Sequence, residues 1–305
     1  MIDFSKKPLF LAPLAGYSDP PLRNVVKRFG CDVTVSEMIS ANALAYENDK
    51  TLKMLKHSHL EKPFIVQIEA SNVESIKNAI CVLNKYDDID GIDLNCGCPA
   101  PKVVKQNAGS ALLKDISLMQ SLIQTIKKYS KKPYLSVKVR IGFDEKIPVI
   151  IAKACEEAGA DFITMHGRTK VGGFSSKVDY EAIKEAKKSI KIPLIANGNI
   201  DENNAQEILQ TTHCDALMIG RASIGKPWIF YEIKNKKSID NKLKKEIILY
   251  HFEQMLEHFK EHGVGLFRKH LHEYSKGMDG ASNFRNNINF ATNSEDMHKL
   301  IVEFF

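Results

Sequence analysis

Eight short apolar runs recur along the first three-quarters of the chain, and this repeat restricts the possible folds more than any other feature. Each run is rich in Val, Ile, Leu or Phe, and longer stretches with helical periodicity separate the runs. The runs are Leu9–Ala12, Asp32–Met38, Pro63–Ala70, Gly91–Cys96, Tyr134–Gly142, Asp161–Gly167, Pro193–Asn199 and Ala216–Arg221. Continuous apolar character, without alternation, is typical of strands buried on both faces of a parallel sheet. Eight strand–helix units within about 230 residues predict a TIM (β/α)8 barrel.

The stretches between the runs carry signals for helix boundaries. We expect helices over Asn72–Tyr86, Asp115–Tyr129, Pro148–Ala158 and Asp201–Gln210. Asn72 and Asp201 are typical N-caps, because their side-chain oxygens accept hydrogen bonds from first-turn amides. Gly30 and Gly159 follow helical stretches, where a C-cap requires a positive φ. A doubly wound sheet is the alternative fold, but its phosphate loop, G-x-G-x-x-G after the first strand, is missing.

The pattern changes after about Asn235. A charged stretch, Lys236–Lys245, is followed by segments that have helical periodicity and no strand signal. These segments are Glu246–His262, Phe267–Lys276 and Asp296–Phe304. We therefore predict two domains, a TIM barrel over residues 1–237 and a small all-helical domain over residues 238–305.

The composition excludes several classes of protein. Hydrophobic residues make up 44% of the 305 residues and charged residues 26%, which is typical of globular chains and not of disordered or collagen-like ones. No apolar run approaches the ~18 residues of a membrane span, and the N-terminal MIDFSKK lacks the apolar segment of a secretory signal. The six cysteines form no disulfide-dense framework. We expect a cytoplasmic protein with reduced thiols and no membrane contact, and the net charge of +6 permits a nucleic-acid partner.

Polar and reactive residues stand where the predicted strands end. TIM-barrel enzymes place their reactive groups at the carboxyl ends of the barrel strands. The residues at these ends are Ala12–Gly16, Ser36–Met38, Gln67, Asn95–Pro99, Lys138, Arg140, His166–Arg168, Asn197–Asn199 and Gly220–Arg221. Such residues would be costly in an apolar barrel unless they face a shared polar ligand. The set therefore predicts an active site.

The last two strand ends predict a phosphate site. Gly198 and Gly220 let backbone amides approach an anion closely, and the guanidinium of Arg221 suits a phosphate. TIM barrels often bind phosphate at the loops after strands seven and eight. Two ordinary turns that need glycine for their geometry are the alternative, but both loops stand in the right register for phosphate.

Cys98 is the candidate for proton or group transfer. It lies between Gly97 and Pro99 in a strand-end loop, where a side chain can be exposed and rigidly held. Cys96-Gly97-Cys98 lacks the second Cys or Cys/His pair of a zinc site, so we expect no metal there, and it is not the C-x-x-C of thiol–disulfide enzymes. A general acid or a nucleophile remains. Cys98 is favoured over Cys96 because it lies further out along the loop.

Three more side chains at strand ends are candidates for the same site. Lys138 and Arg140 are two residues apart and so share one face of their strand. A lysine that reaches solvent at the barrel rim is the alternative for Lys138. His166 could be a core histidine, but its position at a strand end, before Gly167-Arg168-Thr169, favours a functional role.

Taken together, these motifs resemble those of the tRNA-dihydrouridine synthases of bacterial type. The most specific stretches are Asp93–Val103 and Gly220–Phe230. The other matching stretches, in the expected order, are Ala12–Asp19, Ser36–Ala41, Gly109–Leu113, Val137–Gly142, His166–Thr169 and Ala196–Ile200. The tail, with Arg268-Lys269-His270, also resembles the family's C-terminal domain. Leu14 and Cys96 stand where methionine is common, and neither position has a reactive role.

The resemblance implies a flavin enzyme that reduces the 5,6 double bond of particular uridines in tRNA, with NADPH reducing FMN. Cys98 would be the general acid that protonates C5, while reduced FMN delivers hydride to C6. The resemblance assigns the cofactor to Pro13, Leu14, Ala15, Gln67, Lys138, His166, Asn197, Gly198, Asn199, Gly220 and Arg221. Lys138 beside the flavin would favour its anionic reduced form, the better hydride donor. Asn95, Arg140 and Arg168 would contact the flipped uridine, and Arg268 and Lys269 the tRNA.

The chemistry fits these implied roles. A uracil inside folded tRNA must be extruded to reach a buried flavin, so the site must be a pocket that one base can enter. The flavin carries the hydride chemistry, and the protein supplies position and electrostatics. A cysteine thiol is mostly protonated at neutral pH and can therefore donate a proton.

Two other functions remain possible from the residues. An FMN-dependent TIM-barrel oxidoreductase of a small pyrimidine, such as a dihydropyrimidine or dihydroorotate dehydrogenase, would share the phosphate site but gives no reason for the helical tail. An RNA-binding module without catalysis would not need Cys98, Lys138 and His166 together at strand ends.

The charge of the tail does not mark it as the basic part of the chain. Residues 236–305 hold 11 lysines and arginines against 10 acidic residues, and six of the ten histidines. Lys244, Lys245, Arg268 and Lys269 could still form a local basic face. Barrel and tail would then clamp tRNA between them, with an affinity that falls as salt rises. We expect a monomer with no protein partner.

Overall fold

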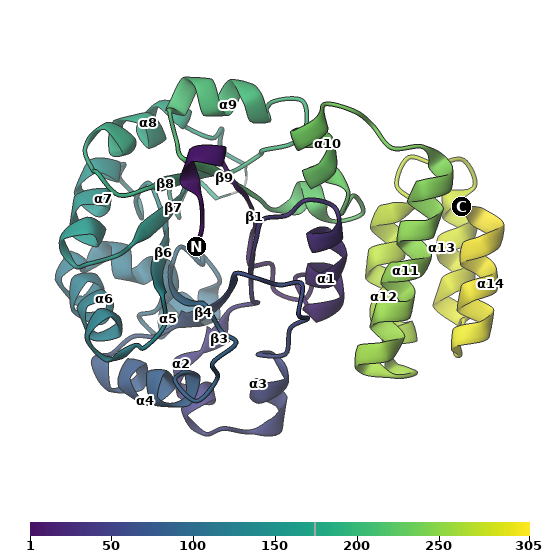
Figure 1. Cartoon of the computed structure of the whole chain (residues 1–305), viewed down its shortest axis with the longest axis horizontal. Coiled ribbons are helices and arrows are strands. Elements are labelled where there is room, and N and C mark those ends of the chain that lie inside the picture. The colour runs from purple at the N-terminus through teal and green to yellow at the C-terminus, as the bar shows by residue number, and fades with distance from the viewer. Residues whose placement is uncertain (174) are drawn as a thin grey trace.

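The chain forms a strand barrel and, beside it, a group of helices at the C-terminal end. Figure 1 shows the computed structural model, which describes residues 1–173 and 175–305. None of the helices in these described residues is both long and apolar enough to cross a membrane.

Eight parallel strands close into the barrel. They are β1 (Leu9–Leu11), β2 (Val33–Val35), β4 (Phe64–Glu69), β5 (Gly91–Cys96), β6 (Tyr134–Arg140), β7 (Phe162–His166), β8 (Leu194–Asn197) and β9 (Ala216–Ile219). Their order is β2-β1-β9-β8-β7-β6-β5-β4, and the pairing of β4 with β2 closes the ring. Each strand lies inside one of the eight predicted runs. The predicted TIM barrel is confirmed, and the doubly wound sheet is wrong.

A further short strand, β3 (Ile39–Ser40), extends the ladder at the end of β4. We did not predict it. The run Asp32–Met38 was expected to form one strand, but it leaves the ladder after Val35, and Ile39 then pairs with Ile68 further along β4.

Helices cover the outside of the barrel (Figure 1). They are α1 (Pro20–Arg28), α4 (Val73–Leu83), α6 (Ile116–Tyr129), α7 (Pro148–Glu157), α8 (Tyr180–Lys188), α9 (Ala205–Thr212) and α10 (Ile229–Asn235). Shorter segments in the connections are α2 (Ala41–Ala45), α3 (Asp49–Lys53), α5 (Pro101–Lys105) and the 3-10 turns η1 (Phe4–Lys6), η2 (Gly109–Lys114) and η3 (Arg221–Ser223). Isoleucine, leucine and valine side chains of the strands and helices pack between the two layers and form the largest part of the core.

The predicted helix boundaries are confirmed at three of four capping positions. The side chain of Asn72 accepts a hydrogen bond from the Ser75 amide at the start of α4, and Gly30 and Gly159 have φ values of 94° and 98°. The N-cap predicted at Asp201 is wrong. Its carboxylate accepts hydrogen bonds from the amides of the next turn, so the chain turns once more before α9 begins at Ala205.

Aromatic side chains close the amino-terminal end of the barrel. Phe10 and Phe162 lie inside it with ring centroids 5.8 Å apart, and Phe4 of η1 packs on Phe162 at 5.6 Å. Burying a side chain of this size stabilises the fold by about 1.5–3 kcal/mol. Because this end is apolar, the polar groups of the strands collect at the opposite, carboxyl end.

Four helices form the C-terminal region: α11 (Asn241–Phe259), α12 (His262–Tyr274), α13 (Ala281–Phe290) and α14 (Ser294–Phe304). They share an apolar core of their own, which also includes Val25 of α1 and Trp228 before α10. We predicted three of these helices and missed α13, whose Asn-rich sequence carries a weak apolar pattern. The first of them begins earlier than predicted, because Asp240 caps it by accepting from the Leu243 amide.

Candidate active site

The strand register brings the predicted polar residues together at the carboxyl end of the barrel. Asn95 of β5 pairs with Lys138 of β6, and Arg140 of β6 pairs with His166 of β7. His166 in turn pairs with Asn197 of β8. Parallel strands therefore place these five side chains around one end of the barrel, as the sequence predicted.

A network of buried hydrogen bonds forms the floor of this site. The Asp93 carboxylate accepts from Gln67 Nε2 at 2.7 Å and from Ser136 Oγ at 2.6 Å. Asn95 Nδ2 donates to Gln67 Oε1 at 2.8 Å. Burial raises the pKa of Asp93 to about 6, although the two hydrogen bonds and the Lys138 charge oppose the shift. Gln67 has no exposed surface, so the structure places it within the floor.

Asn95 also holds the loop that carries Cys98. Its Oδ1 accepts from the amides of Gly97 at 3.1 Å and Cys98 at 2.9 Å. Arg140 Nε donates to the Gly97 carbonyl at 2.7 Å. These bonds fix the loop backbone, while the Cys98 side chain is half-buried and accessible.

Gly109 shows how closely the chain passes behind Cys98. Its φ is +59°, and a Cβ at this position would lie 2.9 Å from the Cys98 carbonyl oxygen and 2.8 Å from Val103 Cγ1. Only glycine combines this backbone conformation with so little space. The following amide, Ser110, donates to the same carbonyl at 3.0 Å.

Lys138 lies between the floor and the next strand. Its Nζ donates to Asn197 Oδ1 at 3.0 Å, and Asn197 Nδ2 donates to the Met218 carbonyl at 2.8 Å. Burial, and secondly the Arg140 charge, lower the pKa of Lys138 to about 8. The negative charge of Asp93 acts in the opposite direction. Lys138 pairs with Asn95, the residue whose side chain holds the Cys98 loop.

Cations gather around His166. Burial lowers the pKa of this imidazole to about 2, and the charges of four cationic side chains add to the shift. These are Lys138, Arg140, Arg168 and Arg221. The histidine is therefore neutral at pH 7, in a region whose positive potential suits an anion.

The loops after β7, β8 and β9 supply groups that fit a phosphate. Arg168 is 3% exposed, its Nε donates to the Ser176 carbonyl, and its Nη1 is buried with no hydrogen-bond partner among the described residues. Arg221 Nη2 donates to Asn199 Oδ1 at 3.1 Å. Gly198 has a φ of 121°, and a Cβ added at this position would lie 3.4 Å from His166 Nε2. The loop backbone therefore passes close to the imidazole. A buried guanidinium with a spare donor, beside this loop, fits a phosphate.

The loop after β1 borders the same region. A Cβ added at Gly220 would lie 3.7 Å from Ala12 and 3.9 Å from Leu14, so the loops after β1 and β9 are adjacent. Pro13 and Leu14 are half-buried, and Ala15 is exposed. The Leu14 amide donates to Ser18 Oγ at 2.8 Å, which fixes the turn.

The two predicted tRNA contacts in the tail lie on α12 and have different surroundings. Lys269 Nζ donates to the Gly16 carbonyl of the loop after β1, and its ammonium lies 5.4 Å from the centre of the Tyr17 ring. Arg268 Nη2 donates to the Ala291 carbonyl at 2.7 Å, within the helical region. Lys269 therefore links the two parts of the chain, while Arg268 braces the helices.

The sequence analysis gave no role to Asp93 or Ser136. Both are polar residues inside apolar strands, and this contrast was the available signal. Gly109 was noted only as part of a matching stretch, since nothing local in its sequence shows the close approach to Cys98.

A second polar region lies beside the barrel, between α10 and the start of α11. It is a cavity of about 810 Å³ whose lining includes Lys226, Lys236, Lys237, Lys244, Lys245 and Lys276. Lys226 forms ion pairs with Glu202 and Glu232 at 2.6 and 2.7 Å. Positive charge remains in excess on this surface, because Glu273 is the one further acidic side chain among the described residues that line it.

Comparison with known proteins gives one consistent result for the sequence. The model of the family described as dihydrouridine synthase (Dus) matches residues 10–304. The chain is 48% identical over 308 residues to a probable tRNA-dihydrouridine synthase of Helicobacter pylori, covering 100% of this chain and 94% of that protein. It is 33% identical to tRNA-dihydrouridine synthase B of Pseudomonas aeruginosa, covering 97% and 92%.

Solved structures show the same barrel at low sequence identity. An old yellow enzyme homologue from Zymomonas mobilis has a TM-score of 0.57 at 15% identity, covering 76% of this chain and 89% of that one. Morphinone reductase has a TM-score of 0.58 at 12% identity, covering 78% and 88%. These likenesses support the fold, while the sequence matches over nearly the whole chain decide the family. The chain belongs to the dihydrouridine synthase family.

Proposed function

We propose that this chain is a tRNA-dihydrouridine synthase that uses FMN and NADPH to reduce the C5–C6 double bond of specific uridines in tRNA. The single observation that carries the proposal is the position of Cys98. Its accessible thiol stands on a braced loop, next to the cations Lys138 and Arg140, above a buried polar floor. Family membership makes the chain a flavin-dependent oxidoreductase, and the site offers the groups that such a cofactor needs.

The residues at the carboxyl end of the barrel fit FMN. Arg168 has a buried donor without a partner among the described residues, and Arg221 and the loop at Gly198 lie on the same side. We assign the phosphate to these groups together with Asn199 and Gly220. Pro13, Leu14, Ala15, Lys138, His166 and Asn197 would border the ring system, with Gln67 beneath it. When bound, FMN supplies the hydride that adds to C6 of the uracil.

The chain's own contribution to the reaction is a proton held at a fixed place. Cys98 Sγ donates its proton to C5, which leaves a thiolate beside Lys138 and Arg140. Both cations stabilise that negative charge. Asn95 keeps the thiol in position through the backbone amides of Gly97 and Cys98. Arg140 supplies donors for the carbonyl oxygens of the extruded base, while Arg168, which the sequence analysis expected to contact the uridine, is assigned here to the phosphate.

The tRNA would lie across the barrel end and the helical region, which we propose to be a separate domain over residues 238–305. Lys269 stands at the edge of the active-site loop, and the lysine-lined cavity lies on the same border between barrel and helices. Lysines at such a border can neutralise the phosphates of the RNA backbone without recognising the base sequence. We expect the protein to act as a monomer in the cytoplasm.

Replacement of the thiol tests the proposed proton donor. Cys98→Ala should retain its flavin and its reduction by NADPH but lose at least 100-fold in the rate of tRNA-dependent flavin reoxidation, because general acid catalysis contributes about 10²–10⁴. Cys81→Ala, which removes an exposed thiol on α4, is the control. Full activity of Cys98→Ala would refute the assignment.

Replacement of Arg221 tests the phosphate site. Arg221→Ala should lower the flavin absorbance of the purified protein and weaken FMN binding by at least tenfold, since it removes a charged partner of the phosphate. Lys188→Ala, on the exposed end of α8, is the control. An unchanged affinity for FMN but weaker binding of tRNA would place Arg221 on the RNA instead.

A small-pyrimidine oxidoreductase is the competing function. It would have the same cofactor site, so only the substrate separates the two. Reoxidation of the reduced enzyme by tRNA, and not by free uracil or orotate, selects the synthase.

A further inference from the structure

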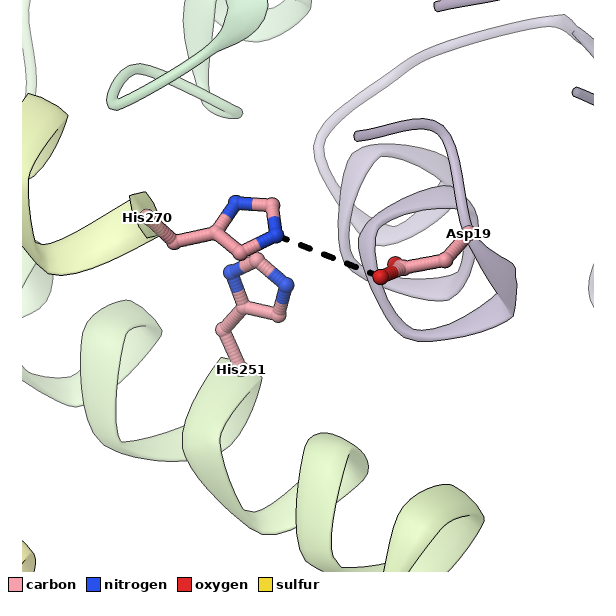
Figure 2. Close-up of side chains that lie close together, drawn as sticks. All are labelled: Asp19, His251 and His270. Atoms are coloured by element: carbon pink, nitrogen blue, oxygen red, sulfur yellow. Dashed lines mark ion pairs between the residues drawn. The ribbon is translucent and has the colours of Figure 1, made fainter. Parts of the chain in front are cut away.

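Three buried side chains meet where the barrel joins the helical region (Figure 2). Asp19 stands at the start of α1, His251 lies in the middle of α11, and His270 lies on α12. The two histidine side chains are at most 1% exposed and Asp19 is 7% exposed. One ligand atom from each residue lies within 4.8 Å of the others, and His270 Nε2 is 4.0 Å from Asp19 Oδ2.

The polar atoms of this cluster are turned toward one another without the hydrogen bonds that burial demands. His251 Nε2 and both ring nitrogens of His270 are buried and have no hydrogen-bond partner among the described residues. In Figure 2 a nitrogen of each ring points toward the Asp19 carboxylate. Leaving one such group buried and unpaired costs about 1–3 kcal/mol. Two such nitrogens aimed at one carboxylate indicate a group that binds all three side chains together.

A hydrogen bond orients one of the two imidazole rings. His251 Nδ1 lies 2.9 Å from the Tyr274 hydroxyl. When Nδ1–H donates to this oxygen, the lone pair of Nε2 is directed at the cluster, as in metal-binding histidines.

Neighbouring helices and loops place both positive and negative charges near this cluster. Lys269 of α12 and Arg23 of α1 contribute positive charge, and Glu37 contributes negative charge. Lys269 directs its ammonium to the Gly16 carbonyl, and Arg23 is engaged in a buried ion pair with Glu61 at 2.7 Å. Both positive groups therefore have partners of their own, and the carboxylate of Asp19 faces the histidines.

We propose that Asp19, His251 and His270 bind one Zn²⁺ ion that ties the barrel to the helical region. Two imidazoles and a carboxylate are common zinc ligands, whereas magnesium and calcium prefer oxygen alone. A tetrahedral ion with bonds of about 2.0–2.1 Å separates its ligand atoms by about 3.3 Å. The 4.0 Å between His270 Nε2 and Asp19 Oδ2 therefore has to close by less than 1 Å, within reach of side-chain rotation.

The zinc would act on structure and not on the reaction. Asp19 follows the loop after β1, which borders the active site, and it begins α1. The two histidines belong to the helices that pack on α1. The ion would thus fix the helical region against the loop that carries Pro13–Gly16. This inference does not depend on the proposed function. The sequence analysis predicted no metal, since it considered only the Cys96–Cys98 pair. The present cluster shows no spacing motif, because Asp19 lies more than 230 residues before both histidines.

Metal analysis of the full-length protein tests the site first. Protein purified without chelator and passed through gel filtration should carry about one zinc ion per chain, measured by elemental mass spectrometry. X-ray absorption at the zinc edge should show nitrogen or oxygen neighbours at about 2.0 Å and no sulfur at about 2.3 Å. Protein that holds no zinc and whose Tm does not change when zinc is added, or a spectrum with sulfur neighbours, would overturn the proposal.

Variants then test which residues hold the ion. His270→Gln should lose the bound zinc and the rise in Tm that zinc gives to chelator-treated protein. His298→Gln, which changes an exposed histidine of α14, should keep both. If His270→Gln retains zinc as His298→Gln does, the proposal is wrong. If His270→Gln fails to fold, the metal content and absorption spectrum of the unmodified protein decide the matter alone.

Discussion

Asn95 gives the sharpest mutational test of how the chain positions its reactive thiol. Its side chain is 6% exposed and makes three hydrogen bonds, two from Oδ1 to the amides of Gly97 and Cys98 and one from Nδ2 to Gln67. Asn95→Ala removes all three. Gln67 is fully buried, so its Oε1 then lacks a partner, whereas the two loop amides are partly accessible to water.

The structure sets the size of the effect. A net loss of about 1 kcal/mol for each of the two loop bonds and about 1–3 kcal/mol for the unpaired Gln67 oxygen gives a destabilisation of about 3–5 kcal/mol. At about 2 °C per kcal/mol, for a chain larger than 250 residues, the Tm should fall by about 6–10 °C. Because the Cys98 loop also loses its anchor, kcat should fall at least tenfold while the KM for tRNA changes little.

Asn95→Asp separates the two contributions. It keeps an acceptor for the Gly97 and Cys98 amides but cannot donate to Gln67, and it adds a charge near Asp93. It should therefore be unstable yet retain more kcat, per folded and flavin-loaded molecule, than Asn95→Ala. The assay is single-turnover reoxidation of reduced flavin by tRNA, with Tm measured by thermal unfolding. An Asn95→Ala protein with unchanged kcat would refute the positioning role.

Two further predictions concern stability. The side chains of the Arg23–Glu61 ion pair are 1% and 0% exposed. Arg23→Met should destabilise the chain by about 3–5 kcal/mol in chemical unfolding, because the buried Glu61 loses its counter-charge and keeps only the hydrogen bonds from Thr34 Oγ1 and Ser58 N. A loss below 1 kcal/mol would contradict this. The pKa of His166 is about 2 when folded and about 6.5 in the unfolded chain, so only the unfolded state binds a proton between these values and stability falls as the pH drops below 6.5. His166→Gln should remove this pH dependence. Between pH 7.5 and pH 5 the wild type should lose about 2 kcal/mol more of its unfolding free energy than the variant does. If the unfolding free energies of the two proteins change in parallel with pH, the buried imidazole is protonated and the prediction is wrong.

The barrel could be predicted from the sequence because each strand is an uninterrupted apolar run. Leu9–Leu11 and Ala216–Ile219, for example, both pair as expected although they lie over 200 residues apart. β3 and α13 were missed because neither contains such an apolar run. β3 is only two residues long, and α13 carries four asparagines and two buried apolar side chains besides Ala281.

The site was predictable where a residue stands at a strand end and not where its role depends on a distant contact. Lys138, Arg140 and His166 were predicted to lie together, and the register places them together. The local sequence of Asn95 does not show that its side chain would hold Cys98, since that depends on the path of the loop in space. The cluster of Asp19, His251 and His270 has no sequence signal at all, because only the packing of α11 and α12 against α1 brings the three together.

Direct detection of the product tests the central claim. Unmodified tRNA transcripts from the same organism should be incubated with the purified protein, FMN and NADPH, and their nucleosides separated by chromatography and mass spectrometry. We predict that dihydrouridine forms at specific positions and that Cys98→Ala forms at least 100-fold less in the same time. Consumption of NADPH without any dihydrouridine in tRNA, or equal yields from the two proteins, would contradict the account.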